Sequence, residues 1–203
     1  MSERGRRERP ASYRSFSADG HAARWERWRL PDERTPLAEA VEERLTLRWE
    51  NEAWTASGIV GSDHVQYVIR ISPIWQVRQF LLFRDLEEPD LWLGSDGNGR
   101  WGEVNGDHRP ELDGCVDIDL ACTPFTNTLP IRRLALDVGG SADILVAMID
   151  VETLDVQPDP QRYTRLAAHR WRFEQKATGF SAEFDVDPFG LVRDYPTLFR
   201  RLD

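Results

Sequence analysis

The feature that most constrains the fold of this chain is the spacing of its apolar residues, which recur at every second position in several segments. In 65–71, valine, tyrosine and isoleucine alternate with positions that include a glutamine and an arginine. Residues 115–120 alternate in the same way, whereas 144–148 is apolar at nearly every position. A period of two is that of a β-strand, and an unbroken apolar run is typical of a strand buried on both faces. The chain is therefore predicted to consist mainly of strands.

Turn signals separate these segments. They are short runs rich in glycine and asparagine, at Asp96–Gly99, Asn105-Gly106, Gly139-Gly140 and Thr178-Gly179. This punctuation predicts roughly ten short strands with almost no helix between them, which is typical of an antiparallel sandwich or open barrel. The best helix candidate is 35–44, where Thr35 can cap the N-terminus and Pro36 suits the first helical position. The alternative for this segment is a lengthened loop.

Length and composition indicate one domain. The chain has 203 residues, a size at which single β domains are common, and residues 1–21 are arginine-rich without apolar periodicity. We therefore expect a disordered basic leader at 1–21 and a single β domain at 22–203. The leader lacks the apolar run of a signal peptide, and no stretch of roughly 18 apolar residues predicts a transmembrane segment. The expected location is the cytoplasm.

Charge and cysteine content narrow the function classes. The net charge is −9, which argues against a nucleic-acid binder, because neutralising phosphates requires a basic face. On an extended strand Cys115 and Cys122 would lie about 23 Å apart, whereas a disulfide spans roughly 4.4–6.8 Å. We expect two free thiols, as in a reducing compartment.

Motifs that would indicate a cofactor or a metal lack the context they need. Residues 97–102 match G-x-G-x-x-G, but an Asn-Gly turn and a proline follow in place of the helix that would receive a pyrophosphate. Asp185-Val186-Asp187 resembles the start of a calcium loop without its later ligands, and the four histidines are scattered. No G-x-S-x-G sequence marks an esterase nucleophile. No cofactor and no metal are predicted.

Three aspartates gather in one segment, with two arginines after it. Asp113, Asp117 and Asp119 fall on one face of a predicted strand, and Arg132 and Arg133 follow a proline-bounded, hydroxyl-rich loop. Because like charges on one face repel, the arginines are candidates to pair with these carboxylates.

Three interpretations of this cluster stay open. In the first, an aspartate–arginine network fixes the loop to the sheet. In the second, the cluster hydrogen-bonds a polar ligand through Asp117, Asp119, Thr126, Asn127 and Arg132. In the third, the two strand aspartates, about 6.6–7 Å apart along the backbone, act as acid and base in hydrolysing a glycoside.

Eight tryptophans are many for this length, and most are expected in the core or against the sheet. An indole also suits the lining of a lipid or sugar pocket, since its faces are apolar and its edge donates a hydrogen bond. Trp75 and Trp101 are the candidates for that role, because each is near arginines at the end of a predicted strand.

Several longer motifs follow one another in a recognisable order and spacing. They are Asp96–Trp101, Leu112–Asp119, Thr123–Arg133, and Asp194–Pro196 with Leu198-Phe199. Together they resemble the bacterial glycolipid-binding domain family, over roughly Trp25 to Leu202. The resemblance implies an all-β fold with a highly curved sheet or half barrel, like that of lipoprotein carriers, and a glycolipid as ligand. Arg100 and Tyr195, which lie in these motifs, join the candidate ligand contacts.

The sequence therefore favours a non-enzymatic protein that holds an amphiphile, either a glycolipid or an acyl compound, in a concave β cavity. A hydrolase of a glycoside or acyl ester that uses Asp117 and Asp119 is the alternative from another class. A third interpretation is an interaction module whose open sheet edge pairs with a partner strand.

Overall fold

The computed structural model describes residues 13–27, 41–61, 65–84 and 88–203. Within these ranges, fourteen strands form one continuous sheet. In sheet order the strands are β7 (Trp101–Glu103), β6 (Leu91–Ser95), β5 (Val77–Phe83), β4 (Val65–Ile71), β3 (Ala53–Val60), β2 (Val41–Glu50), β1 (His21–Arg27), β14 (Phe199–Arg201), β13 (Val192–Tyr195), β12 (Phe180–Val186), β11 (Arg170–Gln175), β10 (Val156–Ala167), β9 (Ser141–Ile149) and β8 (Asp117–Leu120). Neighbouring strands are antiparallel except for β8 and β9, which run parallel.

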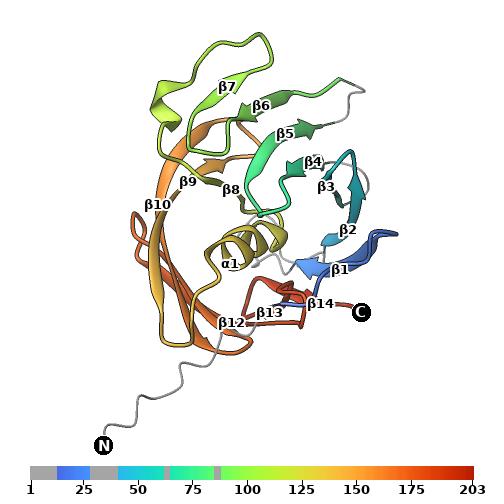
Figure 1. Ribbon diagram of the computed structural model, residues 1–203, viewed down its shortest axis with the longest axis vertical. Helices are drawn as coiled ribbons and strands as arrows, with labels where there is room; N and C mark the ends of the chain where they lie inside the picture. The colour runs from blue at the N-terminus through green and yellow to red at the C-terminus, as the bar shows by residue number, and fades with distance from the viewer. Residues whose placement is uncertain (1–12, 28–40, 62–64, 85–87) are drawn as a thin grey trace, which may run out of the picture.

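The sheet curls around a short helical segment (Figure 1). This segment is a 3-10 turn, η2 (Phe125–Asn127), that runs directly into α1 (Thr128–Leu134). The sheet does not close into a barrel, because its two terminal strands, β7 and β8, are not paired with each other. The predicted all-β fold, one strongly curved and largely antiparallel sheet with little helix, is confirmed.

The connection from β7 to β8 joins the two sheet edges without a strand ladder. The Gly114 N–H donates to the Gly99 carbonyl at 2.8 Å, and the buried Trp101 indole donates to the Cys115 carbonyl at 2.7 Å. A 3-10 turn, η1 (Pro110–Leu112), lies in the same connection. These bonds satisfy backbone groups that an open edge would leave without a partner.

The segment predicted to be a hydroxyl-rich loop is helical instead, and it fills the concave side of the sheet. Phe125, Leu129 and Ile131 are fully buried there. Isolated helices as short as α1 are unstable in water, so packing against the sheet holds it rather than helix propensity. Pro130 is tolerated because N–H groups in the first turn of a helix have no intrahelical partner. The helix ends at Ala135, whose φ of 45° is left-handed.

The predicted helix at 35–44 is wrong over the part that the structure describes. Residues 35–40 lie outside the described residues, and Val41 begins β2, which pairs with both β1 and β3. Leu45 and Leu47 are buried on β2, and Thr46 between them is exposed. This period of two prevails over local helix propensity because the curled sheet buries every second side chain.

The described part of the segment expected to be a disordered leader, residues 13–21, packs against the rest of the chain. Residues 1–12 lie outside the described residues, but Phe16 is buried and stacks on Phe189, with ring centroids 5.2 Å apart. The Arg14 N–H donates to the Pro188 carbonyl at 2.8 Å. The chain therefore packs against the sheet before β1 begins, because an aromatic ring in a polar segment still gains by burial.

Two local predictions are confirmed, the turn at Asp96–Gly99 and the free cysteines. The G-x-G-x-x-G segment begins as the turn between β6 and β7. Asp187 forms a turn, since its carboxylate accepts the N–H groups of Phe189 and Leu191 at 2.8 and 3.0 Å. Cys115 and Cys122 are buried free thiols. No described helix is long and apolar enough to cross a membrane.

Gly58→Ala is expected to destabilise the sheet, and Gly94→Ala is its matched control. A Cβ at Gly58 would lie 2.1 Å from Cζ of the buried Tyr67 ring, whereas a Cβ at Gly94 would meet nothing within 4 Å. We expect Gly58→Ala to lower the free energy of unfolding by roughly 1–3 kcal/mol, because the ring must move. Gly94→Ala should change it by at most about 1 kcal/mol. Urea unfolding measures both, and equal losses would contradict this packing.

Candidate functional site

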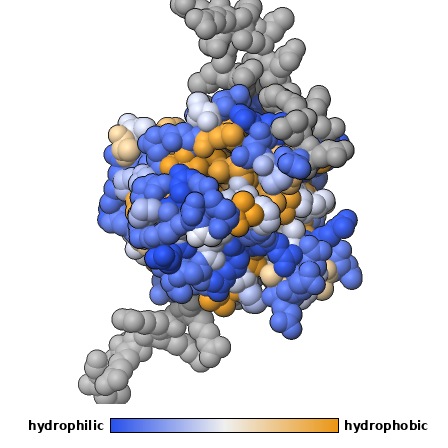
Figure 2. Space-filling model, turned by 90° about the horizontal axis from the view of Figure 1, so that it is seen from above, coloured by the Kyte–Doolittle hydropathy of each residue, from blue (hydrophilic) through white to orange (hydrophobic). Residues whose placement is uncertain are grey.

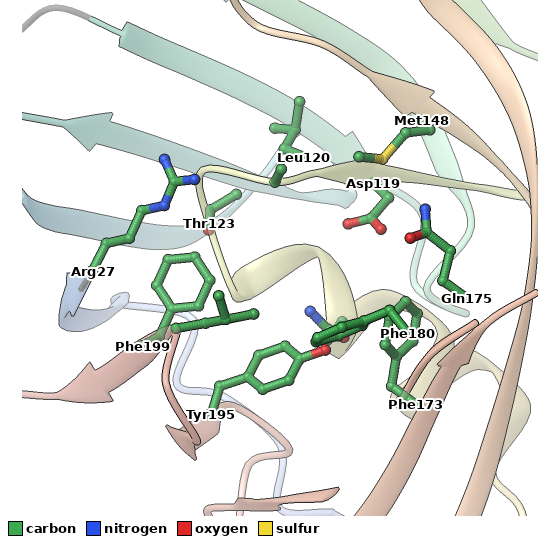
Figure 3. A pocket seen from close by; sticks show the side chains of 13 residues that line it. Arg27, Asp119, Leu120, Thr123, Met148, Phe173, Gln175, Phe180, Tyr195 and Phe199 are labelled. Carbon is green, nitrogen blue, oxygen red and sulfur yellow. The ribbon is translucent and has the colours of Figure 1, made fainter. Parts of the chain in front are cut away.

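A cavity of about 180 Å³ lies between the helical segment and strands β8, β9 and β11–β14 (Figure 3). Phe180 is exposed at its rim, and Met148 and Leu198 are half-buried, so the cavity opens to solvent. Arg27, at the end of β1, is the one basic side chain among the described residues that line it. On the face of the molecule drawn in Figure 2, hydrophobic residues gather in a limited area within a largely hydrophilic surface.

One side of the cavity is aromatic. Phe173, Phe180, Tyr195 and Phe199 come from β11, β12, β13 and β14, which are successive strands of the sheet. The centroids of successive rings lie 6.2, 6.5 and 6.3 Å apart. Because all four rings face the same side of neighbouring strands, they form a continuous apolar wall.

The other side carries a hydrogen-bonded carboxylate. Asp119, on β8, accepts hydrogen bonds from the Thr126 hydroxyl at 2.8 Å and from the Gln161 side-chain amide at 2.7 Å. The Gln161 and Gln175 amides donate to Asp159 at 3.0 and 2.9 Å. Asp119 and Gln175 line the cavity, whereas Asp159 is buried without lining it. Burial raises the pKa of Asp119, and the hydrogen bonds from Gln161 and Thr126 oppose this effect.

Asn127 and the phenol of Tyr195 add further polar groups to the cavity lining. Asn127, in η2, accepts a hydrogen bond from the Tyr163 hydroxyl at 3.1 Å. The Tyr195 side chain is only 4% exposed and points into the cavity (Figure 3). Burial, followed by the nearby charge of Asp119, raises the pKa of the Tyr195 phenol.

A second buried carboxyl group lies beside the cavity. Thr123, which lines the cavity, donates to Oε1 of Glu43 at 2.5 Å, and Tyr67 donates to the same oxygen at 2.6 Å. Glu43 is 1% exposed, and its Oε2 has no hydrogen-bond partner among the described residues. Burial raises the pKa of Glu43 to about 7, although both hydrogen bonds act to lower it. The protonated carboxyl is therefore favoured up to near-neutral pH.

The structure brings only part of the predicted set to this cavity. Asp119, Asn127 and Tyr195 line it, and Thr126 supports it through the hydrogen bond to Asp119. The remaining candidates lie elsewhere: Trp75, Arg100, Trp101, Asp117 and Arg132. Among the described residues, no group of three or more histidine, cysteine, aspartate or glutamate side chains could hold a metal ion.

The predicted contact between aspartate and arginine forms with Arg133 and not with Arg132. Asp117 is fully buried, and Nη2 of Arg133 lies 2.6 Å from its Oδ2. Burial raises the pKa of Asp117, and the Arg133 guanidinium opposes it. This pair fixes α1 to β8. Arg132 lies in a separate aromatic cluster, with its guanidinium carbon 4.2 Å from the Trp75 ring centroid and 4.8 Å from that of Phe16.

The sequence pattern does not identify most of the cavity lining. In sequence, the three phenylalanines of the wall look like ordinary core residues, and β10 shows no apolar alternation. A usable signal is present, however, because Asp159, Gln161 and Tyr163 recur at every second position and are all buried. A strand with a polar inward face indicates a polar interior.

The chain is similar to known proteins over most of its length. A family model described as "Putative glycolipid-binding" matches residues 34–201. The crystal structure of a DUF1089 family protein from Pseudomonas aeruginosa is 34% identical to this chain, with a TM-score of 0.66. That similarity covers 94% of this chain and 95% of the other. A search of curated proteins found no match.

Glu43→Gln is expected to flatten the pH dependence of stability. From about pH 4.5 the unfolded chain releases the Glu43 proton, while the folded protein keeps it until about pH 7. Stability therefore falls as pH rises through this window, by about 3 kcal/mol. The glutamine variant should lack this fall, and Glu42→Gln, at the exposed neighbouring position of β2, should keep it. Urea unfolding between pH 4.5 and pH 8 measures the difference, and parallel profiles for Glu43→Gln and the wild type would refute it.

Arg133→Met is expected to destabilise the protein by about 3–5 kcal/mol, because it leaves the Asp117 carboxylate buried and unpaired. Adding Asp117→Asn should recover part of the loss. Arg162→Met removes an exposed ion pair with Asp143 and should have little effect. Thermal unfolding of the three variants and the wild type measures these losses, and similar losses for Arg133→Met and Arg162→Met would contradict the prediction.

Proposed function

Since the chain belongs to the family described as "Putative glycolipid-binding", we propose that it binds the head group of a glycolipid or a related amphiphile in the cavity beside η2. The ligand is held without covalent chemistry. The aromatic wall contacts its apolar or ring carbons, and Asp119, Asn127, Gln175 and Tyr195 contact its polar groups.

The observation that carries this proposal is the division of one cavity into an aromatic side and a hydrogen-bonding side. Sugar rings have both apolar faces and hydroxyl edges, so they match such a division. The four rings and the Asp119 carboxylate lie on opposite sides of the same space (Figure 3). An all-apolar cavity would suit an acyl chain instead.

The volume limits what part of the ligand is enclosed. Pockets for whole drug-sized ligands measure roughly 300–1,000 Å³, and this cavity measures about 180 Å³. We therefore assign one head group or sugar ring to the cavity. The remainder of the amphiphile leaves past the rim at Phe180, an exposed ring on the open side.

Binding is favoured over hydrolysis by the surroundings of the two aspartates. Asp119 lines the cavity, but Asp117 is paired with Arg133 and does not line it. The two carboxylates of the hydrolase alternative therefore do not flank a common space. The cytoplasmic location stays a prediction.

Extraction of the purified protein tests the proposal. The full chain is purified without detergent and denatured in organic solvent, and the extract is examined by lipid mass spectrometry. We expect an amphiphile in near-stoichiometric amount, because it would stay in the cavity through purification. A protein that is empty, and that takes up no added glycolipid, would refute the proposal.

A cavity-filling variant ties the ligand to the site. Ala121 lines the cavity and is exposed at its rim, so Ala121→Trp should occlude it and remove most of the bound amphiphile. Ala177→Trp introduces the same side chain on the exposed turn between β11 and β12, outside the cavity lining, and should retain the ligand. Equal ligand content in both variants would place the ligand elsewhere.

A further inference from the structure

Two carboxylates, the half-buried Asp119 at the polar side of the cavity and the buried Asp159 behind it, form no ion pair with any described residue. Asp119 and Asp159 share the Gln161 amide, at 2.7 and 3.0 Å. Asp117, two positions before Asp119 on the same strand, is paired with Arg133. Amide and hydroxyl donors stabilise a carboxylate but do not neutralise it, so a buried carboxylate attracts a cation.

The aromatic wall favours the same kind of group. The faces of phenylalanine and tyrosine attract a cation within about 6 Å of the ring centroid, and a set of rings around an ammonium is a common way of binding it. Phe180 and Tyr195 stand beside each other, with centroids 6.5 Å apart, and both line the cavity. Asp119 faces the same space (Figure 3).

A polar atom at the cavity is left unused. The Tyr195 residue is only 4% exposed, and its side chain points into the cavity (Figure 3). No hydrogen bond joins its hydroxyl to another described residue, and this oxygen is not enclosed, so it is available to a ligand. As an acceptor it suits an N–H donor.

We propose that the head group bound in the cavity carries an ammonium group, placed between the Asp119 carboxylate and the rings of Phe180 and Tyr195. This inference rests on the proposed function and adds the charge of the ligand to it. Amino sugars and choline-type head groups share this chemistry. Arg27 stands at the other end of the cavity from Asp119 (Figure 3), where it can contact an anionic group of the same ligand.

A neutral sugar satisfies these groups less well. Its hydroxyl can donate to Asp119, but the carboxylate charge stays uncompensated. A protonated amine both donates a hydrogen bond to Asp119 and neutralises its charge, and charge-assisted hydrogen bonds are roughly twice as strong as neutral ones. A quaternary ammonium has no N–H, so it neutralises the charge and contacts the rings without donating. The cavity should therefore discriminate between ligands that differ only in this charge.

Calorimetric titration of the full chain with two matched pairs of soluble head groups tests the charge. Choline is compared with 3,3-dimethylbutan-1-ol, its uncharged carbon isostere, and glucosamine is compared with glucose. Ionic strength is held constant, since exposed charges are screened by salt. We expect the ammonium member of at least one pair to bind at least tenfold more tightly. The pair that binds distinguishes an amino sugar from a choline-type head group.

Two variants locate the effect. Asp119→Asn keeps the shape of the side chain and should weaken binding of the ammonium compound at least tenfold. Glu174→Gln also removes one negative charge, on the same strand as Phe173 and Gln175, but does not line the cavity and should bind as the wild type does. If Asp119→Asn fails to fold, Phe180→Leu replaces it, because this variant removes one ring at the exposed rim. It should lower the affinity for the ammonium compound more than the affinity for its neutral partner.

The outcomes separate this inference from the proposed function. Equal affinities within both pairs, or undiminished binding by Asp119→Asn, would overturn the ammonium proposal and leave a head-group site for neutral ligands. No binding of any of the four compounds would overturn it as well. In that case, an amphiphile in the organic extract would still support the proposed function, and an empty protein would refute both.

Discussion

A sheet that curls through fourteen strands without closing has a concave face that must be covered from within the same chain. The segment η2–α1 covers it with Phe125, Leu129 and Ile131. Since this segment is short and ends inside the fold, its stability depends on contacts with the sheet. The ion pair of Asp117 with Arg133 is one of these contacts, and it joins the edge strand β8 directly to α1.

Placing irregular backbone and hydroxyl side chains inside a sheet makes the interior partly polar. Hydrogen bonds favour the burial of hydroxyls and amides, and the sheet supplies partners to several of them from β2, β8 and β10. Glu43 accepts a hydrogen bond from the Thr123 hydroxyl, and Asp119 accepts one from the Thr126 hydroxyl. The candidate cavity lies where this polar network meets the aromatic wall of β11–β14. The same network that holds the helical segment thus leaves a carboxylate facing an open space.

The strands were predictable because each buries one face, so their apolar period survives in the sequence. The segment 65–71 is an example, and β4 covers the same residues. The helical segment was not predictable, since its prolines and threonines indicate a loop and its apolar residues are too few to show a helical period. Of the candidate site, Asp119, Asn127 and Tyr195 were identified through motifs. The aromatic wall was not, because an isolated phenylalanine in a strand is the same whether it faces a core or a cavity.

By itself, the sequence determined that the chain forms strands joined by turns, that its cysteines stay free, and that it belongs with the family described as "Putative glycolipid-binding". These properties follow from local alternation, local geometry and motif order, all of which are read along the chain. Only the tertiary structure decided which aspartate is neutralised and which faces a cavity. Asp117 and Asp119 are equivalent in sequence, as the first and third residues of one strand, and they differ only because Arg133 meets one and Gln161 the other. Those partners are 16 and 42 positions away, and the curvature of the sheet brings them together.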